Sequence, residues 1–319
     1  MKSSNPIHVF LLPFLEYCEI EKGLSSNTQR NYNQYLNLFT LWLERTKNLK
    51  LKPHELTRKH IWDYRLFLAQ KYKTKRGKNL TRKSQNYYLI ALRSFLDFLA
   101  DRDIDTLPSS KVKLAKQKAE ETISFLEVRD VEKMLDIPDI TTPQGLRDRT
   151  IMELLFSSGM RVSELVSLDQ DQLSMLEDKK TDRTYELSII GKGSKVRTIF
   201  ISPIAAKWLR KYLASRRDVA APLFINYRSK DPDNKRLSPR SIQLMVSKVA
   251  RLAGISKKVT PHTLRHTYAT DLLGAGADLR SVQELLGHSN VATTQVYTHV
   301  TNKQLRNIHE KFHGKKDGK

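Results

Sequence analysis

Apolar side chains recur at helical spacing through the first hundred residues of the chain. A run of capping residues at 24–28 precedes a stretch in which a 3.6-residue period places large side chains on one face: Tyr32, Tyr35, Leu36, Phe39 and Leu43. Two further helices are predicted to begin near Thr57 and near Thr81, with aromatic and aliphatic residues at the same spacing. Stripes of this kind are typical of a packed core, so residues 1–105 are predicted to form a four-helix domain.

A polar segment follows, and beyond it the pattern changes. Residues 106–122 contain Pro108, two serines and a lysine-rich stretch, so we predict a linker there. In residues 123–302, two β-type runs at 185–190 and 196–201 flank Gly191-Lys192-Gly193-Ser194, which is typical of a hairpin. A further short strand is expected at 223–225. The remaining apolar periods predict helices at 127–135, 146–156, 203–216, 238–253, 261–273, 279–286 and 291–300.

The predicted fold class is therefore mainly α. A four-helix N-terminal domain precedes a mixed α/β, largely helical domain that contains a small antiparallel sheet. The last segment, 303–319, places Leu305, Ile308 and Phe312 on one helical face. A helix this short needs a partner surface to be stable.

The charge of the chain indicates its partner. The 319 residues carry a formal net charge of +22, and both predicted domains are basic. Such charge favours a polyanion, nucleic acid first, with a basic ribosomal-type or chaperone protein as the alternative. The junction between the third and fourth helices is predicted to contact DNA phosphates, although a charge run can also be a solvated loop. Its candidate contacts are Lys73, Lys75, Arg76, Lys78, Arg82 and Lys83.

Cysteine content and hydropathy bear on where the protein works. Cys18 is the only cysteine, so the chain cannot form an intrachain disulfide framework or a cysteine-based zinc site. No run of 18 apolar residues occurs, and the apolar stretch 9–15 is interrupted by Pro13. We expect a soluble cytoplasmic, nucleoid-associated protein without membrane contact.

The candidate chemistry lies in the second half of the chain, where cationic or potentially cationic donors precede one phenol. These residues are Arg161, Lys192, His262, Arg265, His288 and Tyr297. Several positive donors around one tyrosine suit a reaction in which the donors hold a phosphodiester and the tyrosine oxygen attacks its phosphorus. A phenol with an ordinary pKa of about 10 needs nearby positive charge or a base before it can attack.

Two of these residues share a predicted helix start. Thr260-Pro261 supplies an N-cap and a proline at the first helical position, so His262 and Arg265 face the same side near an anion-attracting helix end. The alternative is a metal site formed by His262 and His266. A zincin motif would need glutamate where Thr263 stands, and no third ligand is evident. We predict neither a metal nor a cofactor.

Taken singly, the other candidates also have plain structural interpretations. Arg161 follows a predicted helix end and could be a surface arginine, while Glu164 could orient it or simply be a first-turn acid. Lys192 lies at a hairpin tip, where surface lysines are common. His288 could be a structural histidine at a corner, and Tyr297 a core tyrosine.

The local contexts of the six residues are distinctive when taken together. They are Ser-Gly-Met-Arg161-Val-Ser-Glu164-Leu, Gly191-Lys192-Gly193-Ser194-Lys195-Val-Arg197, Thr260-Pro-His262-Thr-Leu-Arg265-His266, Leu-Leu-Gly287-His288-Ser and Tyr297-Thr-His. In these motifs the chain resembles the tyrosine recombinase (phage integrase-type) family, and most of all its Xer-type members. The resemblance covers about residues 6–312. It implies two domains that form a C-shaped clamp around double-stranded DNA.

The resemblance also implies a site-specific recombinase that cuts and rejoins DNA strands through a 3′-phosphotyrosyl intermediate and a free 5′-hydroxyl. Matching positions make Tyr297 the nucleophile, Lys192 the general acid and His262 the proton acceptor. The phosphorane would be stabilised by the remaining three residues, Arg161, Arg265 and His288. Because the protein–DNA link conserves the bond energy, neither ATP nor metal is required.

The resemblance further implies an assembly on a paired core site. We expect a homotetramer on two DNA sites, or a heterotetramer with a sister recombinase, in which segment 303–319 packs into a neighbouring subunit. The expected role is chromosome-dimer resolution or integration and excision of a mobile element. Two rivals are a type IB topoisomerase-like nicking-closing enzyme and a non-catalytic DNA-binding protein of the same fold. His262 argues against the first, and the complete set of six argues against the second.

Overall fold

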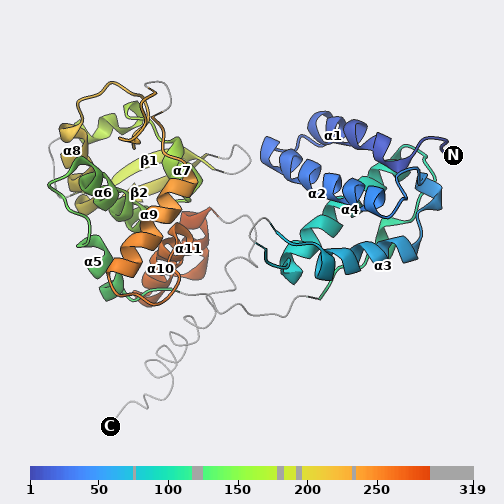
Figure 1. Ribbon diagram of the computed structural model, residues 1–319. Coiled ribbons are helices and arrows are strands. Elements are labelled where there is room, and N and C mark those ends of the chain that lie inside the picture. Colours follow the sequence, from blue (N-terminus) through green and yellow to red (C-terminus); the bar gives the residue numbers. More distant parts are fainter. Residues whose placement is uncertain (75–76, 117–124, 178–182, 192–195, 232–234, 288–319) are drawn as a thin grey trace, which may run out of the picture. The chain divides into compact units, whose positions relative to one another are not determined.

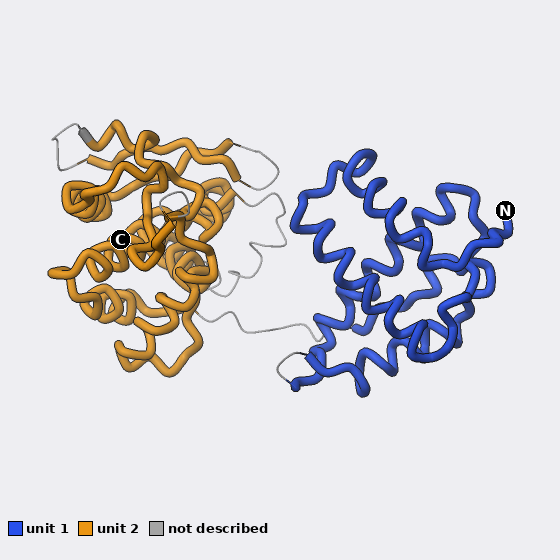
Figure 2. Tube along the Cα trace, turned by 45° about the horizontal axis from the view of Figure 1, so that its top comes forward, with its two compact units in different colours: residues 1–120 blue, residues 121–319 orange. Residues whose placement is uncertain are grey.

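The structure is a computed structural model that describes residues 1–287 except 75–76, 117–124, 178–182, 192–195 and 232–234. The chain divides into two compact units, residues 1–120 and 121–319 (Figure 2). Each unit has a hydrophobic core of its own. Within the described ranges, no helix is long and apolar enough to cross a lipid bilayer.

Unit 1 is built from four α-helices (Figure 1). They are α1 (Leu11–Ile20), α2 (Ser26–Arg45), α3 (Arg58–Leu66) and α4 (Arg82–Asp101). Short 3-10 turns lie at Ile7–Phe10, Pro53–Glu55 and Ser109–Lys111, and a π-helical turn lies at Phe67–Lys71. The predicted aromatic stripes form the core, where the rings of Phe39 and Tyr64 meet edge to face with centroids 5.0 Å apart. The prediction of a helical first domain is confirmed.

Threonine side chains fix the starts of α3 and α4. The Oγ1 of Thr57 accepts a hydrogen bond from the backbone N–H of His60 at 3.4 Å. The Oγ1 of Thr81 accepts one from the backbone N–H of Ser84 at 3.1 Å. Each bond satisfies an N–H group that the first turn of a helix leaves unpaired, which is why both helices begin where the sequence predicts.

The first part of the predicted linker packs against unit 1. The side chain of Val112 is buried in the unit 1 core. The amide of Asn86 on α4 exchanges two hydrogen bonds with the backbone of Ala115, at 3.0 Å and 2.9 Å. Part of the predicted linker 106–122 therefore packs on unit 1, through the apolar side chain of Val112 and the bonds between Asn86 and Ala115.

Unit 2 is largely helical and contains a two-stranded antiparallel sheet (Figure 1). The strands β1 (Tyr185–Ile190) and β2 (Val196–Ile201) pair from Tyr185 opposite Ile201 to Ile190 opposite Val196. A 3-10 segment lies at Asp171–Glu177. The helices are α5 (Val128–Leu135), α6 (Pro143–Ser158), α7 (Val162–Ser167), α8 (Pro203–Ser215), α9 (Pro239–Leu252), α10 (Pro261–Gly274) and α11 (Leu279–Leu286). The predicted mixed, mainly helical class with a small antiparallel sheet is confirmed.

Helix α6 is central to unit 2, because α8, α10 and β2 all pack against it. It begins at Pro143, three residues earlier than the sequence suggested, since Thr142 caps it and the proline fits its first position. Its buried face includes Leu154 and Leu155, and it ends at Gly159 in the left-handed conformation, with φ of 59°. This arrangement places the start of α7 beside α10.

One expected strand does not form. Residues 223–225 are buried, but only Ile225 forms a bridge, an isolated one with Arg236. The preceding residue, Pro222, forms another isolated bridge with Asp169. A run of three apolar residues is compatible with any buried segment, so apolar composition alone was not enough to predict a strand here. The predicted helix 291–300, the tail 303–319 and Lys192 at the hairpin tip lie outside the described residues.

Candidate active site

The structure describes three of the six candidate catalytic residues: Arg161, His262 and Arg265. Glu164, the candidate orienting acid, is described as well. Lys192, His288 and Tyr297 lie outside the described residues.

Arg161 stands at the corner between α6 and α7. The left-handed turn at Gly159 reverses the chain, and Arg161 then serves as the N-cap residue of α7. Its backbone N–H donates to Glu164 Oε2 at 2.7 Å, and its Nη1 donates to Glu164 Oε1 at 2.8 Å. A side chain added at Gly159 would lie 2.3 Å from the ring of Tyr268, so glycine is required here for space as well as for conformation. Glu164 thus bonds the side chain of Arg161 and also caps the first turn of α7.

Arg265 lies in the first turns of α10 and is buried. The Oγ1 of Thr260 accepts from the backbone N–H of Thr263 at 3.3 Å, and Pro261 occupies the first helical position, as predicted. The guanidinium of Arg265 donates through Nη1 to the carbonyl of Gly159 at 2.6 Å and through Nη2 to the carbonyl of Leu286. Arg265 therefore bridges the α6–α7 corner and the end of α11.

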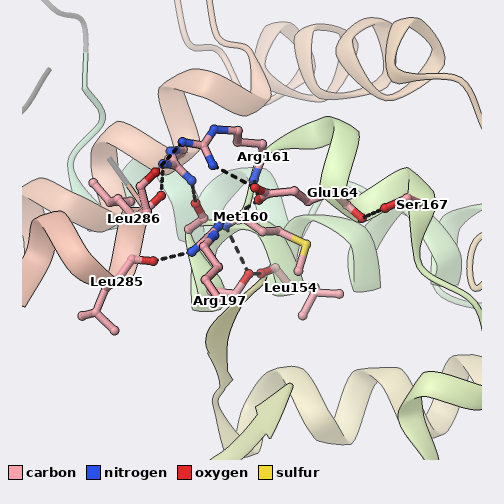
Figure 3. A network of polar contacts seen from close by, with 12 residues as sticks. Leu154, Met160, Arg161, Glu164, Ser167, Arg197, Leu285 and Leu286 are labelled. Atoms are coloured by element: carbon pink, nitrogen blue, oxygen red, sulfur yellow. Dashed lines mark hydrogen bonds and ion pairs between the residues drawn. The ribbon is translucent and has the colours of Figure 1, made fainter. Parts of the chain in front are cut away.

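Arginines gather at the C-terminal end of α11. Arg161 Nη2 donates to the carbonyl of Gly287 at 3.0 Å, and Arg265 reaches the carbonyl of Leu286. Arg197 on β2 donates through Nη1 to the carbonyl of Leu285 (Figure 3). The last carbonyls of a helix carry partial negative charge and no helical partner, so they draw cations. Three arginines from three elements thus converge immediately before His288 in the chain.

Sequence reasoning did not single out Arg197. Its Nη2 donates to Glu164 Oε2 at 2.8 Å, on the same carboxylate that holds Arg161. Figure 3 shows Arg197 and Arg161 on either side of Glu164. The signal in the sequence was strand alternation, which places Arg197 on the same face of β2 as the buried Ile199 and Ile201 but does not identify its partner.

The electrostatics of Glu164 favour its charged form. Burial by itself would raise the pKa of this carboxyl group, but hydrogen bonds from Arg197 and from the backbone N–H and side chain of Arg161 together lower the pKa below its ordinary value of 4.5. Glu164 is therefore a carboxylate at neutral pH, and it can hold two guanidinium groups at once.

His262 is kept neutral by its surroundings. Burial is the largest cause that lowers its pKa below the ordinary value of 6.5, and the positive charges of Arg265 and Arg161 lower the pKa further. Its Nε2 lies 2.9 Å from Nε2 of His266, one turn along α10. A neutral imidazole has a nitrogen lone pair, so His262 can accept a proton. Among the described residues, no group of three His, Cys, Asp or Glu side chains is placed to hold a metal ion.

The candidate DNA-contact residues of unit 1 lie around a small turn before α4. Lys73 and Asn79 form an antiparallel bridge, and the backbone N–H of Thr74 donates to the carbonyl of Lys78 at 2.9 Å. Lys73, Lys78, Arg82 and Lys83 are all exposed, the last two in the first turn of α4, while residues 75–76 lie outside the described part. Exposed cations next to a helix N-terminus can bind phosphate groups.

Comparisons with known proteins identify related families and proteins. Residues 124–304 match the Phage integrase family, and residues 12–103 match the Phage integrase, N-terminal SAM-like domain. The chain is 38% identical over 303 residues to the tyrosine recombinase XerD of Listeria monocytogenes serovar 1/2a, covering 94% of this chain and 97% of that protein. It is 35% identical over 313 residues to the tyrosine recombinase XerC of Bacillus subtilis, covering 95% and 96%.

Solved structures share the fold. The XerH site-specific recombinase bound to difH substrate, in a pre-cleavage complex, matches with a TM-score of 0.70 at 18% identity and covers 96% of this chain and 97% of that one. The Tn1549 transposon integrase bound to transposon right end DNA matches with a TM-score of 0.68 at 18% identity, covering 97% and 100%.

Proposed function

Since the chain belongs to the Phage integrase family and is a tyrosine site-specific recombinase, we propose that it exchanges DNA strands through a covalent link at Tyr297. The Oη–P bond to Tyr297 forms as the P–O5′ bond of the scissile phosphodiester breaks. The phenol proton passes to neutral His262, and Lys192 donates a proton to the departing O5′. The product is a 3′-phosphotyrosyl link with a free 5′-hydroxyl, and a second 5′-hydroxyl reverses the step to rejoin the strand.

One observation carries this proposal. The guanidinium groups of Arg161 and Arg265 come from different elements and donate to neighbouring carbonyls at the end of α11, one and two residues before His288. A phosphorane bears more charge on its equatorial oxygens than the ground-state phosphodiester does. Two guanidinium groups fixed next to each other, with His288 following, can stabilise that additional charge. The chemistry needs no ATP because one phosphate ester replaces another.

We propose double-stranded DNA with a paired core site as the partner, and chromosome-dimer resolution as the role. The likeness to the tyrosine recombinases XerD and XerC extends over almost the full length of both relatives, which favours this role over integration of a mobile element. Four subunits on two DNA sites, either identical or paired with a sister recombinase, would carry out the exchange. The tail 303–319 would link neighbouring subunits through Leu305, Ile308 and Phe312.

A strand-exchange assay tests the function. The DNA is a duplex site that the protein selects from a random-sequence pool, placed on two labelled fragments of different length. With EDTA present and ATP absent, we expect recombinant fragments of the two predicted new lengths. Relaxation of supercoiled plasmid without recombinant fragments would instead identify a nicking-closing enzyme, and binding without any strand breakage would identify a non-catalytic DNA-binding protein.

Binding to that site should depend strongly on salt, falling about 10³–10⁵-fold between about 50 and 200 mM if roughly 6–10 phosphates are neutralised. The double variant Lys73→Gln, Lys78→Gln should reduce the slope of log affinity against log salt by about 1.8, because each phosphate contact contributes about 0.9. The measurement is a titration by fluorescence anisotropy at several salt concentrations.

Lys47→Gln, Lys50→Gln is the matched control, since it removes the same charge from exposed lysines elsewhere in unit 1. Equal slopes for the two double variants would show that the turn at residues 73–79 does not contact DNA.

A further inference from the structure

We propose that Arg197 is a positioning residue for strand cleavage, which holds Arg161 in place for the scissile phosphate by way of Glu164. The inference rests on the function proposed above and adds a residue to its machinery. Arg197 itself does not touch the phosphate in this proposal. Its guanidinium fixes the carboxylate that fixes Arg161.

The hydrogen bonds around Glu164 carry the inference (Figure 3). Glu164 Oε1 accepts from the side chain of Arg161 at 2.8 Å. Glu164 Oε2 accepts both from the backbone N–H of Arg161, at 2.7 Å, and from Nη2 of Arg197, at 2.8 Å. Because Glu164 is buried, its carboxylate depends on these donors in place of water. Without Arg197, the side chain of Glu164 can rotate, and the guanidinium of Arg161 moves with it.

Burial separates the tasks of the two arginines. The side chain of Arg161 is 31% exposed and can meet a ligand, whereas that of Arg197 is 11% exposed. Both terminal nitrogens of Arg197 donate to protein groups, Glu164 and the carbonyl of Leu285. Its Nε is buried and has no hydrogen-bond partner among the described residues. In this proposal Arg197 therefore acts through Glu164.

Arg197 also supports the backbone that leads to His288. A Cβ added at Gly287 would lie 2.6 Å from Cδ of Arg197, so the chain passes directly over the arginine stem. Gly287 has φ of 61°, the left-handed conformation that ends α11. The carbonyl that Arg161 contacts belongs to this same residue. Arg197 thus contacts both structures that hold Arg161, the carboxylate on one side and the glycine corner on the other.

Position 197 requires the forked guanidinium group of arginine. Two terminal nitrogens reach two acceptors on different elements, Glu164 on α7 and Leu285 on α11. Lysine carries the same charge on a single nitrogen and cannot make the same pair of bonds in the same directions. The variant Arg197→Lys therefore keeps the charge and removes the geometry, and Arg197→Met removes both.

The first test measures cleavage of a nicked suicide duplex at saturating protein, together with the dissociation constant for the same DNA. Arg197→Lys and Arg197→Met should each slow cleavage by about 10–100-fold, by analogy with residues that orient the protein ligands of a metal ion, with the dissociation constant changed by less than about threefold. The control is Arg216→Met. Arg216 is more buried, at 2% side-chain exposure, and donates to Asp218 and to backbone carbonyls, none of which belongs to the site.

Arg216→Met should lose thermal stability as Arg197→Met does, yet cleave at the wild-type rate when folded. If both variants slow cleavage in proportion to their fall in melting temperature, Arg197 is only structural and the proposal is wrong. If Arg197→Met does not fold, the cleavage rate of Arg197→Lys still decides between the two roles.

The second test removes the negative charge of the scissile phosphate, which Arg161 is proposed to stabilise. A methylphosphonate at the scissile position has no negative charge, so a correctly placed guanidinium group contributes less to its cleavage. The deficits of Arg161→Ala and of Arg197→Lys, each relative to wild type, should shrink together by about tenfold or more on this substrate. A deficit of Arg197→Lys that is equal on both substrates would overturn the proposal.

A double variant completes the test. If Arg197 acts through Arg161, then Arg197→Lys combined with Arg161→Ala should cleave no more slowly than Arg161→Ala alone. Multiplied losses would contradict the inference. Its failure is distinguishable from failure of the proposed function, because in the latter case the wild-type protein itself forms no covalent adduct.

Discussion

Replacing Tyr297 by phenylalanine should abolish the covalent protein–DNA adduct and leave the affinity for duplex DNA unchanged. The substitution removes one oxygen, the atom that is proposed to attack phosphorus, and retains the ring. The groups proposed to hold phosphate lie on Arg161, Arg265 and the basic residues of unit 1, so binding should persist. The measurement is a denaturing gel of the protein with an end-labelled, nicked suicide duplex, in which wild type should give a slow band that the variant lacks.

Tyr268→Phe is the matched control. Tyr268 packs against Gly159, close to the arginines, but burial raises its pKa, only partly opposed by the charges of Arg197 and Arg265. A protonated, buried phenol is a poor nucleophile. We expect the adduct to form normally in this variant. An adduct that survives in Tyr297→Phe and disappears in Tyr268→Phe would assign the nucleophile to Tyr268.

Arg161→Ala should reduce the cleavage rate about 10²–10³-fold while changing the dissociation constant far less, as expected for loss of one donor to a transition-state oxyanion. Arg265→Ala should have an effect of the same size, with an added fall in melting temperature. The difference arises because Arg265 is buried and bridges the carbonyls of Gly159 and Leu286, which would lose their partner. Single-turnover cleavage, binding and thermal melting should be measured on the same preparations.

Arg236→Ala provides the control for Arg161→Ala. Its side chain has similar exposure, 37% against 31%, and it too donates to a carboxylate, that of Asp169, and to a backbone carbonyl, that of Val166. We expect normal cleavage in this variant. Equal losses of binding and of rate in Arg161→Ala would show that Arg161 only positions the DNA.

Local signals allowed much of this arrangement to be predicted from the sequence. Thr260 and Pro261 fixed the start of α10 and so placed His262 and Arg265 on one face, because capping and proline act within a single turn. The turn at Gly159 and the acid at Glu164 likewise specified the corner that carries Arg161. Alternating strand residues around two glycines specified the β1–β2 hairpin.

Features that depend on contacts distant in sequence could not be predicted in this way. The convergence of three arginines on the end of α11 joins residues that are 21 to 126 positions apart in the sequence. No local pattern encodes it. The packing of Val112 in the unit 1 core and the bond from Asn86 to Ala115 also join residues that are distant in sequence. Residues 223–225 are buried but form no strand.

The most direct test of the central claim identifies the linked residue by mass spectrometry. The adduct is formed on a duplex labelled at the 5′ end of the scissile strand, digested with nuclease and trypsin, and analysed for a peptide that carries a nucleotide. Tryptic peptide 281–303 contains Tyr297 and no other tyrosine, whereas peptide 266–280 contains Tyr268. We predict a nucleotide joined through its 3′-phosphate to Tyr297, and retention of the 5′ label by the protein before nuclease digestion. A nucleotide on peptide 266–280, or a label lost with the released strand, would contradict it.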